Sequence, residues 1–406
     1  KPCKKRLPKD LPRRQVIHLP PEVEGKEDEF EKIGQDINEE LNYIPSKFEV
    51  VEHVYPKYKY KTQTDGKIYQ ALAIDRPIYK GRPGTGLLAQ LLVAKYCDHM
   101  PLDRQVKIFK RLNIAIPKST MVHWTAKCHE LLTPICEKMK KQILSGDYVL
   151  SDDTPVRVLD KNKPGTTHRG YLWIYGDLNQ VVYDYTPGRS REGPHTFLNG
   201  YTGFLQTDGY TAYNGIPTEG EITRMGCWSH ARREFFELKD SEAALTEVPL
   251  RLAGKLFAID KEYFGSAINF ETRKSQAETV LHEFKKWLDE TIKNVLPAST
   301  IALAIKYCLN QWDRLTVYYK YPHLRIDNNF SERCVKSAVI GRKNWLFFGS
   351  HEGGKRSATI YSLVESCKLQ GHNPWEYLND VLSRLDETPM NIENLTPLNW
   401  KKPERV

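Results

Sequence analysis

The chain has 406 residues, of which 60 are Lys or Arg and 51 are Asp or Glu, and its formal net charge is +9. Single domains usually contain roughly 100–200 residues, so this length predicts two or more structural units. A hydrophobic fraction of 40% is enough for a sizeable core and excludes a fully disordered chain. The moderate positive charge permits a polyanionic partner such as nucleic acid without requiring one.

The sequence contains no candidate membrane span and no secretion signal. Its best apolar run, Gly86 to Tyr96 (GLLAQLLVAKY), includes Gln90 and Lys95 and is shorter than the roughly 18–20 residues that a span needs. The basic first residues are not followed by an apolar segment, and because the chain begins with Lys1 we expect a fragment or a processed chain. The eight cysteines form no Cys-x-x-Cys pair, which favours reduced thiols and a cytoplasmic location.

The first 85 residues are rich in Lys, Pro and Tyr and show little hydrophobic patterning. Within them, Phe48 to Tyr55 has the composition of a strand, which Pro56 would end. Residues 81–86 (GRPGTG) have the composition of a linker.

From Leu87 to Leu144 the hydrophobic residues recur with a helical period and predict three helices. The third helix is predicted to begin near Pro117, with Ser119 as its N-cap. The second and third helices are consistent with a helix-turn-helix unit that binds DNA, and equally with an ordinary helical hairpin.

The pattern then changes to strands. Strands are predicted at residues 148–153, 170–176, 180–185, 203–209 and 222–228, and the sequence DLN between the second and third is typical of a hairpin. Residues 229–238 predict a helix, and residues 240–310 predict a helical insertion because strand-type segments lie on both sides of it. Residues 325–348 and 354–370 predict two further helices, or a helix and a hairpin.

Three acids stand in different settings. Asp152 and Asp208 each end an apolar strand that is predicted to lie inside a sheet, and Glu332 opens a predicted helix just after Asp327. Carboxylates at the ends of adjacent strands, joined by a third from a helix, make an oxygen-only ligand set that suits Mg²⁺ or Mn²⁺ rather than Zn²⁺. Two such ions can activate a water or a hydroxyl and stabilise the leaving oxygen of a phosphodiester.

Each acid also has a purely structural interpretation. Asp152 or Asp153 can cap a turn at a strand end, and Asp208 with the following glycine is a common turn dipeptide. Glu332 fits a capping box, in which its side chain reaches back to a backbone N–H. Spacing alone favours these interpretations, and only the combination of acids indicates a catalytic centre.

The chain resembles the transposases of the insertion sequence 66 family, which carry an Asp-Asp-Glu catalytic centre on an RNase H-like fold. The resemblance runs from about Leu11 to the C-terminus, and Asp153 stands where the family usually has Glu. The motifs that carry it together are SDDTPV at 151–156, LQTDGY at 205–210, GCWSHARR at 226–233, DNNFSER at 327–333, GRKNWLF at 341–347 and IYSL at 360–363.

The resemblance implies an α/β fold with an RNase H-like mixed sheet, flanking helices and a helical insertion, together with an N-terminal α+β or helical region. It implies Asp152, Asp208 and Glu332 as the metal-binding catalytic triad, with Mg²⁺ or Mn²⁺ as cofactor. The expected domains are an N-terminal region without the family's cysteines (1–85), a helical candidate DNA-binding region (86–146), the first part of the catalytic core (147–239), the helical insertion (240–310), the second part of the core (311–370) and a C-terminal tail (371–406).

Cys227 and His230 form a Cys-x-x-His motif with the spacing of two zinc ligands, but no second pair stands nearby in the sequence, so the motif is poor evidence for a metal. A buried cysteine and a hydrogen-bonded histidine at a strand–helix junction explain it as well. The resemblance implies a third role, in which His230 contacts the scissile phosphate or orients an acid. We also expect Asp153 and Asp327 to support the triad.

Basic and aromatic residues interleave after Glu332. Trp345 and Phe347 can stack on flipped bases, although a place in the core is the commoner role for such residues. Arginine and lysine neutralise DNA phosphates. The cations that we expect to contact DNA are Arg232, Arg233, Arg333, Lys336, Arg342 and Lys343.

Members of the family usually carry a four-cysteine zinc module ahead of the catalytic region. The matching stretches here, residues 22–34 and 57–66, contain no cysteine, and so we expect no structural zinc. The family's upstream segment, which resembles a leucine zipper, has no counterpart in this sequence. We therefore expect recognition of the element's ends to be weakened or transferred to residues 86–146.

The sequence is interpreted as the DNA transposase of an insertion sequence, which nicks the element's ends and joins the exposed 3′-hydroxyl to target DNA. The expected partners are double-stranded DNA and further copies of the chain, in a homodimer or a higher assembly, with no membrane. The expected location is the cytoplasm, at the bacterial nucleoid. The alternatives are an RNase H-like metal-dependent nuclease, and a domesticated DNA-binding protein without catalytic activity.

Overall fold

The computed structural model describes residues 47–58, 69–71, 76–78, 81, 83–160, 165–216, 222–265, 268–385 and 391–403. The chain divides into two units, Lys1–Ala73 and Ile74–Val406. Most of the first unit, including nearly all of the two stretches matched to the family's zinc module, lies outside the described residues.

In the first unit, β1 (Lys57–Tyr58) pairs antiparallel with β2 (Tyr69–Gln70). The strand predicted at Phe48 to Tyr55 is wrong, because these residues belong to no strand and Val50 is 89% exposed. Residues of this composition form strands where a neighbouring strand and a core cover them, and neither covers this segment in the described unit.

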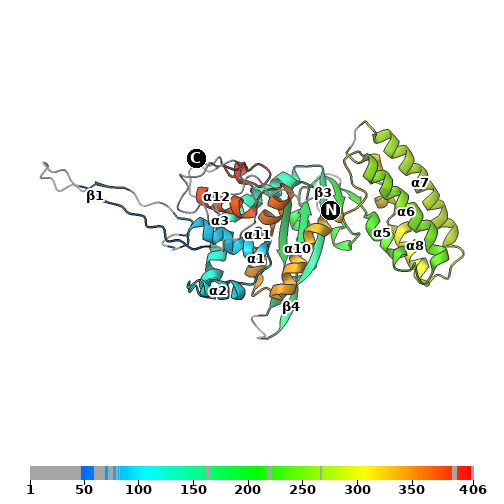
Figure 1. Cartoon of the computed structure of the whole chain (residues 1–406). Coiled ribbons are helices and arrows are strands. Elements are labelled where there is room, and N and C mark those ends of the chain that lie inside the picture. The colour runs from blue at the N-terminus through cyan, green and yellow to red at the C-terminus, as the bar shows by residue number, and fades with distance from the viewer. Residues whose placement is uncertain are drawn as a thin grey trace, which may run out of the picture. The chain divides into compact units, whose positions relative to one another are not determined.

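The second unit is built on a five-stranded sheet, which Figure 1 shows with helices beside it. The strand order is β5-β4-β3-β6-β7; β3, β4 and β5 run antiparallel, whereas β6 and β7 are parallel to β3. The predicted mixed α/β fold is therefore confirmed. The strands are β3 (Tyr148–Leu159), β4 (Thr167–Gly176), β5 (Val181–Thr186), β6 (Gly203–Gln206) and β7 (Ile222–Met225).

The prediction that β3 ends at its acidic residues is wrong. β4 pairs with β3 as far as Leu159, so Asp152 lies in mid-strand opposite Ile174. On the other side, β6 pairs only as far as Leu150, whose partner is Gln206. Asp152 therefore lies in a strand but beyond the end of its parallel neighbour, on a stretch of β3 that residues before and after α10 (Asn329–Trp345) contact instead, through Asn328 and Phe348.

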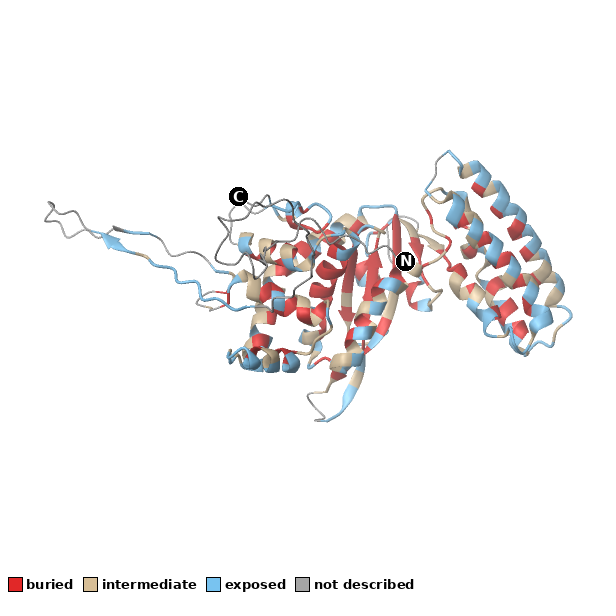
Figure 2. Cartoon of the chain, viewed as in Figure 1, coloured by how far each residue is buried: buried red, intermediate tan, exposed pale blue. Residues whose placement is uncertain are grey.

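Helix α11 (His351–Leu369) covers the edge strand β5 with hydroxyl groups. Ser362 Oγ accepts the N–H of Tyr183 at 2.8 Å. Ser366 Oγ accepts the N–H of Val181 and donates to its carbonyl. An open strand edge invites pairing with another chain, and these serines satisfy it from within. Figure 2 shows α11 and the sheet as the most continuously buried part of the second unit.

Helix α10 (Asn329–Trp345) packs on β3 and β4. Phe330 occupies the space over Gly176, where a Cβ would lie 2.5 Å from the ring. Glycine at that position therefore lets the start of α10 approach the sheet closely, which brings the residues that follow Phe330 towards β3.

The predicted three helices before the sheet are confirmed as α1 (Thr85–Tyr96), α2 (Leu102–Arg111) and α3 (Lys118–Leu144). They share a small core of Leu91, Leu102, Phe109 and Met121. The prediction of Ser119 as N-cap is wrong: Pro117 caps α3, because its φ of −61° already suits a helix start and leaves Ser119 inside the first turn.

Between β7 and α10 the chain forms α5 (Trp228–Phe236), α6 (Ala243–Tyr263), α7 (Phe270–Thr291) and α8 (Thr300–Asn310), and Figure 1 shows α6, α7 and α8 side by side. Arg273 of α7 is buried, pairs with Asp260 at 2.6 Å and donates to the carbonyls of Tyr321 and Leu324. These bonds fix the helices to the segment that leads into α10.

The remaining short elements complete the second unit. Residues 371–406, expected as a tail, contain a packed helix, in which Tyr377 and Leu382 are buried. Among the described residues these elements are α4 (Glu192–Phe197), α9 (Trp312–Leu315), α12 (Pro374–Arg384) and 3₁₀ helices at Thr211–Tyr213, Tyr318–Lys320 and Ile392–Leu395. None of the helices in the described part of the chain is long and apolar enough to cross a membrane.

Candidate active site

Asp152 and Asp208 occupy equivalent positions on neighbouring parallel strands. The last pair of the β3–β6 ladder is Leu150 with Gln206, and each aspartate lies two residues beyond its member of that pair. Carboxyl ends of parallel strands meet at one edge of a sheet. The two acids, predicted from their place after apolar strands, are therefore brought together by the register of the sheet.

Burial, with smaller contributions from the negative charges of Asp208, Asp153 and Glu332, raises the pKa of Asp152 to about 7. The N–H of Asp153, 2.7 Å from Asp152 Oδ1, opposes this effect by favouring the charged form. A carboxylate that other carboxylates surround without a paired cation is a characteristic of functional sites.

Asp208 follows β6 in a tight turn. Its Oδ1 accepts the N–H of Tyr210 at 2.9 Å, and Gly209 has a φ of +91° that a residue with a side chain rarely adopts. The turn interpretation of Asp208 is therefore correct locally, and the same turn also holds the carboxylate near Asp152.

Asp153 is held by a residue that sequence reasoning missed. Its carboxylate, 4% exposed, accepts two hydrogen bonds from Nε of Arg189 and one from its Nη2, at 2.9–3.1 Å. The guanidinium lies 3.7 Å from the ring centre of Tyr210, whose hydroxyl donates to the Arg189 carbonyl. Arg189 thus connects β3 to the turn of Asp208; nothing in its local sequence distinguishes it from a surface arginine.

Asn328 is a second residue that was missed as a site residue, although it belongs to the DNNFSER motif. It is fully buried, its Nδ2 donates to the Ser151 carbonyl at 2.8 Å, and its backbone N–H points to Cys227 Sγ at 3.3 Å. The start of α10 is therefore tied to the residue just before Asp152. Asp327 joins the same segment to α5, because its Oδ2 accepts a hydrogen bond from Ser229 Oγ at 3.0 Å.

Glu332 lies in the first turn of α10, as predicted. Its Oε1 has no hydrogen-bond partner among the described residues, and its Oε2 lies 3.9 Å from Nη2 of Arg233. The capping-box interpretation finds no support, because the N-cap of α10 is Asn328 and Glu332 sits one position later than such a box requires.

Cys227, His230 and Glu332 together could hold a metal ion, since one ligand atom from each lies within 4.8 Å of the others. The half-site is therefore joined in space by a third candidate ligand, Glu332 of α10, which is distant from it in the sequence. Burial raises the pKa of the Cys227 thiol to about 12. Sulfur and imidazole ligands suit Zn²⁺ rather than Mg²⁺.

His230 is not the hydrogen-bonded histidine that was offered as an alternative. Its Nδ1 is buried without a hydrogen-bond partner in the described structure and lies 3.8 Å from Glu332 Oε1. Asp152, Asp208 and Glu332 do not form a similarly close group within the described residues. Glu332 thus forms a close group with Cys227 and His230, while its charge also acts on Asp152.

Comparison with known proteins agrees with this arrangement. The Transposase IS66 family model matches residues 80–356, and the IS66 C-terminal element matches residues 362–398. The chain belongs to the IS66 family of transposases. Its family domains indicate a transposase.

Relatives of this IS66 family member occur in Sinorhizobium fredii (strain NBRC 101917 / NGR234). The uncharacterized protein y4qI is 30% identical over 391 residues, which cover 91% of this chain and 72% of the relative. The uncharacterized protein y4jD is 30% identical over 421 residues, which cover 97% of this chain and 81% of the relative.

The expectation of no zinc is wrong. The zinc-finger binding domain of transposase IS66 matches residues 24–62. The expectation relied on the lack of cysteine in this stretch, and one missing ligand type does not exclude the domain. The matched stretch lies largely outside the described residues.

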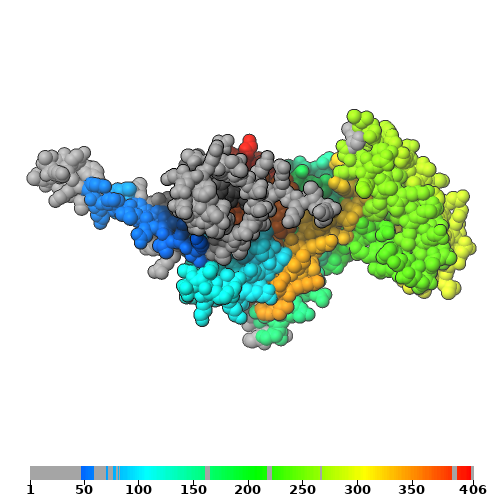
Figure 3. Space-filling model, viewed as in Figure 1, coloured from blue at the N-terminus to red at the C-terminus, as the bar shows by residue number. Residues whose placement is uncertain are grey.

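The cations expected to contact DNA lie on two helices of this IS66 family member. On α10, Arg333, Lys336 and Lys343 are exposed along one side, and Figure 3 shows the outer side of α10, in orange, open on the face in view. Arg342 instead donates to Thr154 Oγ1 at 2.9 Å and to the Pro155 carbonyl. These bonds engage Arg342 with β3, whereas the three exposed cations are available to a ligand.

The two aromatic residues after α10 differ in their surroundings. Trp345 stacks on Phe348 with ring centres 4.6 Å apart, while Phe347 is 40% exposed. The core interpretation therefore describes Trp345 better than Phe347. On α5, Arg232 lies over the ring of Phe236 at 5.2 Å and Arg233 is exposed near Glu332.

Proposed function

We propose that this chain is the transposase of an insertion sequence, which cleaves DNA at the element's ends and joins the 3′-hydroxyl to target DNA by phosphodiester transesterification. The observation that carries the proposal is the register of β3 and β6, in which Asp152 and Asp208 lie at equivalent positions two residues beyond the last pair, Leu150 with Gln206. The charge of Asp208 also helps to raise the pKa of Asp152, so acids far apart in the sequence act on one another, in a family of transposases.

We further propose that the sheet is the core of an RNase H-like fold, divided between residues 147–239 and 311–370 by the insertion of residues 240–310. The three-stranded meander followed by two strands parallel to its first member supports this assignment. Residues 86–146 would then serve DNA binding through α2 and α3, and residues 1–85 through the zinc-finger match.

The proposed triad offers a ligand set that fits divalent cations such as Mg²⁺ or Mn²⁺. All its donors are carboxylate oxygens, Glu332 Oε1 lacks a hydrogen-bond partner in the described structure, and the charges of Asp208 and Glu332 help to raise the pKa of Asp152. When bound, such ions supply an activated water or hydroxyl and stabilise the leaving oxygen. To join this ligand set, the Glu332 side chain would turn away from Cys227 and His230.

The chain's own residues would hold the acids and the DNA in place. Arg189 and Asn328 fix the elements that carry the triad, and the exposed cations of α10 would contact phosphates and orient the scissile bond. Joining two ends requires two active sites, so we expect a dimer or a larger assembly on DNA, at the bacterial nucleoid.

The test uses the full chain with Mg²⁺ or Mn²⁺, labelled DNA that carries the element's ends, and a target plasmid. We expect cleaved ends and joined products, both lost in Asp152→Asn, whose wild-type carboxylate lies part-buried in a strand and accepts the N–H of Asp153. Asp184→Asn is the matched control, because Asp184 also lies part-buried in a strand and accepts the N–H of its successor, at 2.9 Å, outside the proposed site.

Two outcomes would overturn parts of the proposal. Cleavage without joining, even from ends cut in advance, would indicate a metal-dependent nuclease. No cation-dependent heat in calorimetry of the parent chain would indicate a DNA-binding protein without catalysis, especially if Asp152→Ala with Asp208→Ala changes nothing.

A further inference from the structure

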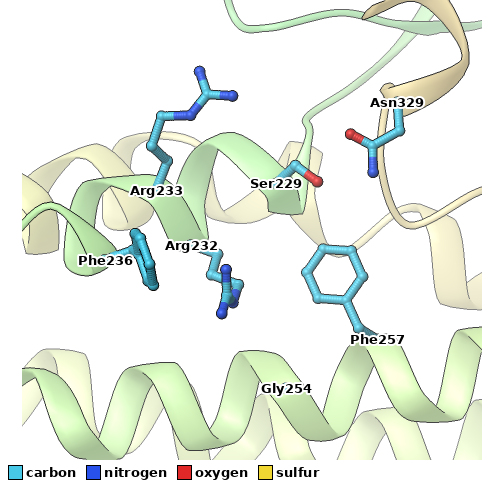
Figure 4. Close-up of a pocket in the computed structure, with 7 residues that line it drawn as sticks. All are labelled: Ser229, Arg232, Arg233, Phe236, Gly254, Phe257 and Asn329. Carbon is cyan, nitrogen blue, oxygen red and sulfur yellow. The ribbon is translucent and has the colours of Figure 1, made fainter. Parts of the chain in front are cut away.

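A cavity of about 520 Å³ lies between α5 and α6. Figure 4 shows Arg232 of α5 and Phe257 of α6 pointing into the space between the two helices, with Asn329 at its edge. Small-ligand sites usually measure about 300–1,000 Å³, so the cavity is large enough for one nucleotide. Its lining residues are Ser229, Arg232, Arg233, Phe236, Gly254, Phe257 and Asn329.

The cavity opens beside the proposed triad. Ser229 Oγ and Asn329 Nδ2 both donate to Asp327 Oδ2, at 3.0 and 2.5 Å, in the segment that leads into α10. Arg233 lines the cavity and also lies 3.9 Å from Glu332. DNA bound at Glu332 would therefore lie close to the residues that line the cavity.

The lining combines positive charge with aromatic rings. Arg232 and Arg233 bring two guanidinium groups, and none of the seven lining residues is acidic. Phe236 is 41% exposed, and Phe257 lies half-buried across the space. Guanidinium groups bind phosphates, and phenyl rings stack on bases of any sequence because every base has a π-face.

Gly254 contributes a further, independent observation. It lies in mid-helix on α6, where glycine lowers helix stability relative to alanine. A Cβ at this position would meet no described atom within 4 Å, so close packing does not require the glycine. The missing side chain instead leaves open space in the wall of the cavity.

We propose that this cavity binds one unpaired nucleotide of the DNA on which the transposase acts, with the base against Phe236 and Phe257 and the phosphate at Arg232. The inference rests on the proposed function. It assigns to the helical insertion the task of holding a displaced nucleotide next to the cleavage site. Binding one base in the cavity, outside the DNA duplex, would fix the position of the neighbouring phosphate relative to the triad.

The test measures binding of the full chain in EDTA to two duplexes of the same length, one fully paired and one with a single unpaired 2-aminopurine. We expect the wild type to prefer the second duplex about tenfold, as one stacked base allows, and to change the fluorescence of the probe. Gly254→Leu fills the cavity without removing charge, and Phe236→Ala removes a ring. Each should abolish the preference while leaving binding of paired DNA unchanged.

Tyr321→Ala is the matched control, because Tyr321 is 41% exposed, as Phe236 is, and lies outside the cavity. No preference in the wild type, or equal losses in Phe236→Ala and Tyr321→Ala, would overturn the inference. So would full competition by free deoxyadenosine monophosphate at micromolar concentration, which would indicate a site for a free nucleotide. Gly254→Leu should have a Tm at or slightly above that of the wild type, because leucine is the better helix former, which would show that its effect is not unfolding.

Failure of this inference is distinguishable from failure of the proposed function. Binding is measured without divalent cations, so it does not depend on cleavage. Cleavage and joining with no preference for the unpaired nucleotide would overturn only the cavity's role. A clear preference without cation-dependent cleavage would overturn only the catalytic proposal.

Discussion

Replacing Asp152 with asparagine should stabilise the chain in the absence of divalent cations. Burial, with the nearby carboxylates, raises the pKa of Asp152 from 3.8 to about 7. One pKa unit corresponds to about 1.4 kcal/mol, so full ionisation of Asp152 costs the folded chain about 4 kcal/mol. Asparagine removes this cost and keeps the oxygen that accepts the Asp153 N–H.

The stability gained by Asp152→Asn, measured as the difference in free energy of unfolding from the wild type, should increase with pH. Below the unfolded pKa of 3.8 the carboxyl is protonated in both states and the cost is absent. As pH rises towards 7, the unfolded chain loses its proton first, so the wild type loses stability, and the full cost is present above the folded pKa. The free energy of unfolding of Asp152→Asn should therefore exceed that of the wild type by about 2 kcal/mol at pH 5 and about 4 kcal/mol at pH 8.

Scanning calorimetry of the full chain in EDTA, at pH 5 and pH 8, measures this difference. For a unit of this size, about 4 kcal/mol corresponds to a Tm increase of roughly 6 °C. Adding Mg²⁺ or Mn²⁺ should raise the Tm of the wild type and of Asp184→Asn but not that of Asp152→Asn, because bound cations stabilise only a folded chain that holds them. A Tm difference independent of pH, or equal cation stabilisation in all three chains, would refute the reasoning.

Three further predictions follow from the site. His230→Ala should lower DNA cleavage far more than DNA binding, measured on the same DNA, because its unpaired Nδ1 lies 3.8 Å from a carboxylate oxygen of the triad. Alanine at Arg333, Lys336 and Lys343 should reduce the slope of log K against log salt concentration by about 3 in anisotropy titrations, if each contacts one phosphate. Added Zn²⁺ should inhibit Mg²⁺-dependent cleavage by occupying Cys227, His230 and the third acid, and Cys227→Ala should relieve the inhibition.

Each of these predictions has an outcome that contradicts it. Equal losses of cleavage and binding in His230→Ala would show that His230 has no specific role in cleavage. An unchanged salt slope would show that these three cations of α10 do not contact DNA phosphates. Zinc inhibition that persists without the cysteine would indicate that the ion acts elsewhere, for example at the zinc-finger match of residues 24–62.

Local patterns in the sequence predicted the elements of the second unit well. Apolar runs and turn residues predicted the β4–β5 hairpin, and helical periodicity predicted α1, α2, α3 and the helices of residues 240–310. These features depend on residues close in the chain, whose side chains define one face or one turn. The strand predicted at Phe48 to Tyr55 failed because composition alone does not supply a partner strand.

The geometry of the candidate site depends on contacts between distant residues and could be predicted only in part. The acids were identified from their place after apolar strands and through the family resemblance, but the register that pairs Leu150 with Gln206 is not visible in either strand. Glu332 reaches Cys227 only after the chain has passed through the whole insertion. Arg189 and Asn328 are ordinary polar residues in the sequence and become significant through the partners that the fold gives them.

The binding of divalent cations by Asp152, Asp208 and Glu332 is tested most directly by anomalous scattering from crystals of the full chain soaked in Mn²⁺. We predict a manganese peak in contact with both aspartates and with Glu332, which turns away from His230 to reach it. A peak confined to Cys227 and His230, or no peak at the aspartates, would contradict the proposed catalytic centre.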